Sequence, residues 1–384
     1  MRQVLPALCL FVLTFATAAC RADDAWPLYR QAGERIEAGD RLGKSSPSAT
    51  NMAYTGYPPY SPEWERVASA AYEYNAPALA DVRRASAMTA AAWPAERVDG
   101  HPSYAHLDAL RNITNQVGDA ALLEHVRGGD ASAVARVRDL LHLADLLDDG
   151  RPGPILQPLV AAGIRAVALD RLLIVNSGIR LTDQPTTAAI PATTATTPAT
   201  AGGKAVSVAD VDALIRQLFV RDPETAVARA DRLVGGARAE DSKTYAKAEE
   251  AERVRTVFRR DVTERNLVAM ALACRLFRFR NQRWPASLDE LAALLPAPPA
   301  DAAGPMGYAL VKAGLPDGGD RPLVYSRAGV PAGGRPAYPT AEPQFSHYSN
   351  YVPGNRIPPG QFRDVTLWPG KPDPAEQIAL KPLD

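Results

Sequence analysis

The feature that most constrains the fold of this chain is an uncharged apolar run within residues 261–295. Residues 267–274 carry no charge, and apolar positions continue to Phe277 at helical spacing. These positions occupy two sides of the helix, and a helix that is apolar on two sides is normally buried on both. The run therefore predicts a long core helix with neighbours on two faces.

The expected structural core comprises apolar positions of this helix and one tryptophan beyond it. These residues are Leu267, Met270, Ala271, Leu272, Cys274, Leu276, Phe277 and Trp284. Asn281 suits a left-handed helix end, and Pro285 disfavours helical geometry in the residue before it. Ser287 and Glu290 have the spacing of a capping box, which predicts a short second helix ending at Pro296.

The same region carries a family resemblance. Residues 264–267 read ERNL and residues 281–291 read NQRWPASLDEL. This helix-to-turn pattern resembles uncharacterised exported helical proteins of planctomycete-type bacteria, and also the globular domain of the type II secretion pseudopilins. A weaker likeness continues through Tyr308 and residues 323–326. The resemblance implies a small α+β unit and implies no activity.

Two departures from the pseudopilin pattern are visible in the sequence. Ala302 follows Asp301 where the family has a phenylalanine, and residues 330–335 contain no carboxylate where pseudopilins hold calcium. The N-terminus also differs, because pseudopilins begin with a continuous hydrophobic helix after a prepilin cleavage site. The resemblance is therefore to a domain, not to a complete secretion pseudopilin.

Residues 1–19 have the layout of a secretory signal peptide. Arg2 precedes a short apolar segment, residues 4–13, and small residues lead to Cys20. The apolar segment is too short to span a bilayer, so we expect an exported chain without a transmembrane helix in its mature form. Cys20 is a lipidation candidate that would anchor the protein to a membrane. The leucine usual three positions before such a cysteine is missing, so ordinary cleavage beside the preceding alanines is the alternative.

The pattern of helical spacing and loop residues predicts a mainly α fold, an irregular helical array or bundle, with a small C-terminal α+β pseudopilin-like region and an extended Pro-rich tail. Residues 185–205 are rich in Thr, Ala and Pro without an apolar period. They form either a spacer, or an O-glycosylated segment, or a tolerated insertion. The expected divisions are a signal peptide at 1–19, a helical array at 20–184, a low-complexity linker at 185–205, a helical segment at 206–260, the α+β region at 261–330 and the tail at 331–384.

Local signals place several helix ends. Gly129 and Asp130 are read as a turn and an N-cap, and Ser207 with an acid three residues later has box-like spacing. A helix opening at residues 222–224 is expected to stop at Gly235 and Gly236. From residue 242 a charged pattern runs without a break into the apolar run, so one long helix is expected there.

The sequence contains little that indicates chemistry. Lys plus Arg equals Asp plus Glu at 43 each, so the chain has no overall field that attracts nucleic acid. Phosphate-loop, dinucleotide-binding, zinc-protease and nucleophile-elbow motifs are missing from it. His142 and Asp145 stand one helical turn apart, as in a metal site, but no third ligand has matching spacing. Asp145 and Asp148 are interpreted as a solvated helix end, and we expect no metal or cofactor.

These observations lead to two functional hypotheses. The first is a non-catalytic scaffold or binding module of the cell envelope, in the periplasm or membrane-anchored, with an envelope protein or a glycan as partner. The alternative is an exported hydrolase with a site between the helical array and the C-terminal sheet. A cleft with convergent carboxylates or histidines would favour the hydrolase.

Overall fold

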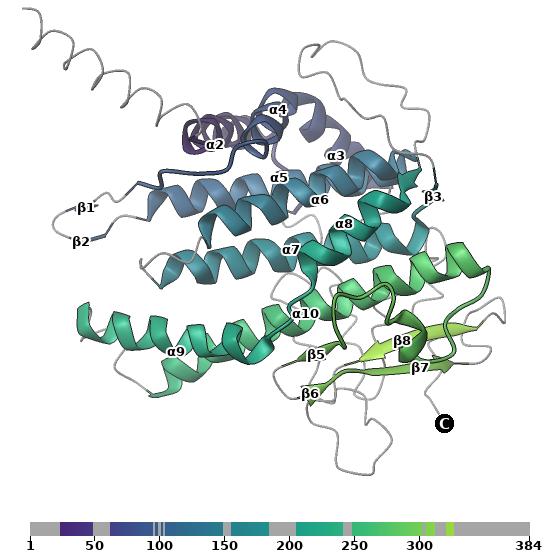
Figure 1. Cartoon of the computed structure of the whole chain (residues 1–384). Helices are drawn as coiled ribbons and strands as arrows, with labels where there is room; N and C mark the ends of the chain where they lie inside the picture. The colour runs from purple at the N-terminus through teal and green to yellow at the C-terminus, as the bar shows by residue number, and fades with distance from the viewer. Residues whose placement is uncertain are drawn as a thin grey trace, which may run out of the picture.

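The computed structural model describes residues 24–48, 62–94, 97–98, 101–102, 104–148, 155–183, 205–240, 248–301, 304–311 and 320–325. The expected signal peptide, Cys20, the tail at 331–384 and almost all of the linker at 185–205 lie outside these residues. Figure 1 shows a helical assembly with a small β region at one side. A mainly α fold is thus confirmed for the described part of the chain.

Helices make up most of the described part of the chain. They are α2 (Trp26–Arg41), α3 (Pro62–Tyr74), α4 (Ala76–Ala85), α5 (Ala105–Val126), α6 (Asp130–Leu147), α7 (Leu156–Gly178), α8 (Val208–Leu218), α9 (Pro223–Glu240), α10 (Ala248–Asn281) and the 3-10 turn η2 (Leu288–Leu291). The strands are β1 (Arg97–Val98), β2 (His101–Pro102), β3 (Leu181–Thr182), β4 (Val206–Ser207), β5 (Ala300–Asp301), β6 (Gly304–Pro305), β7 (Gly307–Val311) and β8 (Arg321–Tyr325).

The helices form layers around α5, α6 and α7, which pack side by side (Figure 1). On one side α2 packs on α4 and α5, and α3 packs on α5. On the other side α10 packs on α7, α8 and α9 (Figure 1). The segment before α8 returns beside the end of α7, where β3 and β4 pair in parallel, with Leu181 opposite Val206.

Helix α10 links the helical layers to the β region. Its second half contacts η2, β5 and β8, and β7 pairs antiparallel with β8, with Ala309 opposite Leu323 (Figure 1). This hairpin lies where the sequence predicts a small antiparallel sheet against the central helix. The boundary expected between the helical segment at 206–260 and the α+β region at 261–330 falls inside α10, so the helix runs through it without a break.

The buried apolar side chains separate into a large cluster and two small ones. The main core joins α2, α4 to α8 and the second half of α10, and extends to Met306 and Val324 near the hairpin. A small cluster of Trp64, Ala68, Leu122 and Leu123 fixes α3 on α5. A second, which we call the satellite core, joins the start of α7, α9 and the first half of α10. It consists of Ile155, Ala230, Val234, Ala251, Val254 and Phe258.

Several local expectations agree with the structure. The Ser207 side chain caps α8 by accepting from the backbone N–H of Asp210 at 3.1 Å. Asp222 caps α9 in the same way, with its Oδ1 3.0 Å from the backbone N–H of Thr225. The long helix expected from residue 242 into the apolar run is α10. Short-range capping patterns therefore predict these helix starts.

Three local expectations are wrong. Helix α9 continues through Gly235 and Gly236 to Glu240, because glycine permits a helix end without imposing one. Asp130 is the first residue of α6 and Gly129 its N-cap, since the Asp130 carboxylate binds His125 and Arg180 instead.

The third correction concerns the predicted capping box. Ser287 precedes one 3-10 turn, not a longer α-helix, and its side chain makes no cap hydrogen bond. The Glu290 carboxylate accepts from the backbone N–H of Ala286 at 2.6 Å and binds the Arg283 guanidinium. The left-handed residue is Gln282, with φ of 54°, one position after Asn281. The contacts of Glu290 with Ala286 and Arg283 thus replace the expected contact with Ser287.

Candidate functional site

A network of charged side chains, several of them buried, lies where α10 packs on α7 beside the end of α6. It separates the satellite core, whose last member on α10 is Phe258, from the main core, whose first member on α10 is Leu267. We call it the polar belt. Its members are Asp145 of α6, Asp148 at the C-cap of α6, Arg165 of α7, Arg229 of α9 and Arg260, Asp261, Glu264 and Arg265 of α10.

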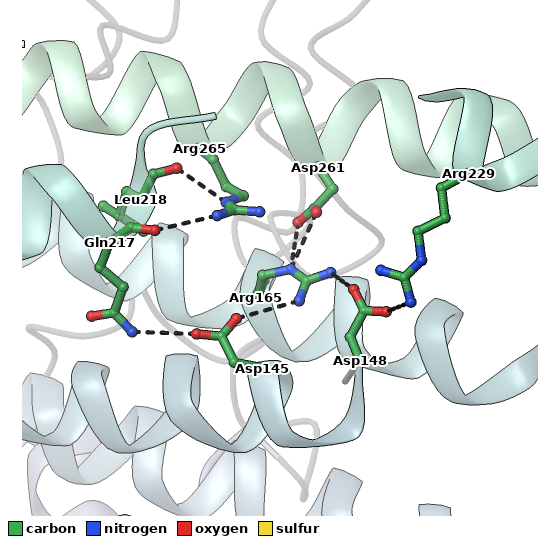
Figure 2. A network of polar contacts seen from close by, with 8 residues as sticks. All are labelled: Asp145, Asp148, Arg165, Gln217, Leu218, Arg229, Asp261 and Arg265. Atoms are coloured by element: carbon green, nitrogen blue, oxygen red, sulfur yellow. Dashed lines mark hydrogen bonds and ion pairs between the residues drawn. The ribbon is translucent and has the colours of Figure 1, made fainter. Parts of the chain in front are cut away.

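Arg165 is the centre of the polar belt (Figure 2). Its Nε donates to both carboxylate oxygens of Asp261, at 3.0 and 3.1 Å, and its Nη2 donates to Asp148 at 2.9 Å. The Arg165 side chain is 4% exposed, and those of Asp148 and Asp261 are 8% and 7% exposed. Burial alone would lower the pKa of Arg165, but the carboxylates of Asp261 and Asp148 outweigh burial and raise it. Arg165 therefore remains charged and joins α6, α7 and α10.

Further contacts extend the polar belt to α8 and α9 (Figure 2). The Arg229 guanidinium lies 2.5 Å from the second carboxylate oxygen of Asp148. Arg265 donates to the backbone carbonyls of Leu218 and Gln217, at 3.1 and 3.2 Å, at the end of α8. Burial lowers the pKa of Arg265, with Asp261 opposing the shift. The three α-helices that pack on α10, namely α7, α8 and α9, are thus each tied to the polar belt by a charged group.

Glu264 is the member of the polar belt whose pKa is shifted into the physiological pH range. Burial raises the pKa of Glu264 to about 7, with the nearby carboxylates of Asp261 and Asp170 adding to the shift and Arg260 opposing it. The residue is 7% exposed, and Arg260 Nε donates to its Oε1 at 2.7 Å. A buried carboxyl group with such a pKa is the type of group that acts as a general acid or base.

The structure buries each of the eight apolar residues that the sequence places in the core. Met270 and Leu276 are fully buried, and Phe277 and Trp284 are each 8% exposed. Cys274 is a buried cysteine. The Arg278 guanidinium lies 4.3 Å from the centre of the Trp284 ring, so the tryptophan also covers the end of α10.

The histidine and aspartates considered as a metal site have other roles. His142 Nε2 lies 2.7 Å from the carbonyl oxygen of Met88, and Asp145 lies 3.7 Å from Arg165. The interpretation of Asp148 as a solvated helix end is wrong, because it is buried between two arginines. Within the described ranges no group of three or more His, Cys, Asp or Glu side chains is arranged to hold a metal ion.

Sequence reasoning missed the polar belt, although α7 carries a signal. Arg165 interrupts an apolar stretch at residues 159–169, and an isolated arginine in such a stretch requires a buried partner. Asp261 and Glu264 are similarly the last acidic residues before the apolar run of α10. Arg165 and Asp261 are 96 positions apart in sequence, so local spacing does not reveal their pairing.

None of the helices in the described part of the chain combines the length and the apolar character needed to cross a bilayer. Comparison of the chain with protein-family models, with curated proteins and with solved structures finds no match.

Proposed function

We propose that this chain is an exported cell-envelope protein that acts as a non-catalytic scaffold or binding module. Export is supported by the signal-peptide layout of residues 1–19. The observation that carries the scaffold assignment is the polar belt, in which Arg165, Arg229 and Arg265 each bind a group outside their own helix. Charged groups engaged in this way fix the positions of helices.

The proposal includes a membrane anchor and a partner. Lipidation of Cys20 would place the protein at a membrane, and an envelope protein or a glycan is the proposed partner. The small sheet that packs on α10 and the motif at residues 281–291 support a pseudopilin-like C-terminal region.

Export is tested by fusing residues 1–25 to a reporter that is active only outside the cytoplasm. Activity of this fusion, and its loss when the apolar segment 4–13 is interrupted by two aspartates, is the expected result. A reporter that stays in the cytoplasm with the intact leader would overturn the proposal. Fractionation of the full chain, with and without Cys20→Ser, then reports anchoring separately from export.

One observation favours the alternative of an exported hydrolase, namely the pKa of Glu264 near neutrality. The purified protein is tested with chromogenic ester, glycoside and peptide substrates beside Glu264→Gln. The scaffold proposal predicts no turnover by either protein. Turnover by the parent that Glu264→Gln abolishes, with an unchanged melting temperature, would support the hydrolase.

A further inference from the structure

The described chain begins at Asp24, four residues after the lipidation candidate Cys20. An extended chain spans at most about 3.6 Å per residue, so Asp24 lies no more than roughly 14 Å from Cys20. The headgroup layer on each side of a bilayer is itself about 5 to 7 Å thick. A lipid on Cys20 would therefore hold the start of α2 close to the membrane surface.

An uncharged segment lies beside the start of α2. Residues 85–94, which read ASAMTAAAWP, contain no charged side chain. The backbone N–H of Ala25 donates to the carbonyl oxygen of Ala90 at 2.9 Å, and the N–H of Ala92 donates to Asp24 at 2.8 Å. The two stretches thus form one surface, which we call the N-terminal face. It consists of Asp24, Trp26, Pro27, Ala90, Ala92 and Trp93.

Two half-buried tryptophans lie in the N-terminal face. The rings of Trp26 and Trp93 meet edge to face, with their centroids 5.7 Å apart. The indole nitrogen of Trp93 donates to the carbonyl oxygen of Leu146 at 3.1 Å, so this ring is fixed on α6. An indole ring combines an apolar body with one N–H, and tryptophan is enriched for that reason where a membrane meets water.

The remaining members of the N-terminal face place little charge on it. Pro27, Ala90 and Ala92 are exposed. Asp24 is the charged member, and its Oδ1 accepts from the backbone N–H groups of Trp26 and Ala92, at 3.0 and 2.8 Å. These bonds stabilise the carboxylate within the protein. The face therefore loses little hydration of charged groups when it meets the headgroup layer.

We propose that the N-terminal face docks on the bilayer that the lipid on Cys20 enters, with Trp26 and Trp93 at the level of the headgroups. This docking rests on the proposed anchor at Cys20 and adds the surface through which the anchored protein meets the membrane.

The test uses the chain from residue 20 onward, joined through the Cys20 thiol to a maleimide lipid in phosphatidylcholine vesicles. Cys274 is 1% exposed, so it should not couple, and Cys20→Ser checks this. Chemical coupling replaces the lipid that a cell would add. Failure of the anchor in the cell therefore appears in the fractionation of Cys20→Ser, and failure of the docking appears on the vesicles.

The readout is quenching of tryptophan fluorescence by bromine on the lipid chains close to the headgroups. We expect brominated vesicles to quench the tethered protein. Trp26→Phe with Trp93→Phe should remove most of this quenching. Trp64→Phe, which changes a tryptophan that is 3% exposed, should keep it.

A second set of variants changes the N-terminal face and keeps its tryptophans. Ala90→Glu with Ala92→Glu places two carboxylates at exposed positions of the face, so most of the quenching should be lost while the melting temperature stays the same. Ala228→Glu with Ala293→Glu adds the same charges at exposed positions outside the face and should keep the quenching.

Two results would overturn the docking. The first is tryptophan emission of the tethered parent that brominated vesicles leave unchanged. Such a result together with a dimer in sedimentation would show that a second copy of the chain covers the face instead. The second is quenching that persists in Ala90→Glu with Ala92→Glu, which would place the contact with the bilayer elsewhere on the protein.

Discussion

Replacing Arg165 by leucine should destabilise the protein strongly, since it removes a cation from between buried carboxylates. Arg165→Leu leaves Asp261, 7% exposed, without the guanidinium that contacts both of its oxygens. Asp148 keeps Arg229 as a partner, and Asp145 is 49% exposed and reaches water. The loss therefore falls mainly on Asp261.

The expected magnitude follows from that distribution. Removing one partner of a buried pair costs about 3 to 5 kcal/mol, and we expect the lower value, about 3 kcal/mol, because Arg265 remains near Asp261. The assay is urea unfolding followed by circular dichroism, with the free energy of unfolding extrapolated to water.

Arg255→Leu is the matched control. Arg255 also lies on α10 and also binds two carboxylates, those of Asp231 and Glu252, but the pairs are exposed. Its removal should change the unfolding midpoint only slightly, as is usual for surface pairs. An Arg165→Leu protein that unfolds at the same urea concentration as Arg255→Leu would refute the reasoning.

Three further predictions use other parts of the molecule. Leu272→Asp should lower the free energy of unfolding by about 4 kcal/mol or more, while Leu42→Asp, at a position 67% exposed, should leave the melting temperature nearly unchanged. Asp130→Asn should cost about 2 kcal/mol at neutral pH, measured by thermal unfolding. Burial opposes a lower pKa of Asp130, but hydrogen bonds from His125 and Arg180 outweigh burial and lower this pKa below its usual 3.8. The difference in free energy of unfolding between the parent and Asp130→Asn should therefore be present above pH 3.8 and disappear as the pH falls through the lowered pKa. Cys20→Ser should move the protein from the membrane fraction to the soluble fraction if the cysteine is lipidated, and an unchanged distribution would argue against the anchor.

The parts of the fold that sequence predicts are those set by local physics. The apolar run at residues 267–274 predicts a buried helix because its pattern leaves no polar face. Ser207 and Asp210 predict a helix start because the hydroxyl reaches a backbone N–H three residues away. The extent of α10 follows from the absence of a breaker between residues 248 and 281.

The parts that sequence does not predict depend on partners far along the chain. Arg165 and Asp261 stand 96 positions apart, and their pairing depends on how α7 and α10 cross. The satellite core likewise requires α7, α9 and α10 to be placed before its members can be identified.

The central claim is that the polar belt holds the helices together, and a double-mutant cycle between Arg165 and Asp261 tests it most directly. The free energy of unfolding is measured for the parent, Arg165→Leu, Asp261→Leu and the double variant. Since leucine at both positions leaves no unpaired charge between them, the double variant should be more stable than the sum of the single losses predicts, with a coupling of about 2 kcal/mol. Additive losses, with a coupling near zero, would contradict the claim.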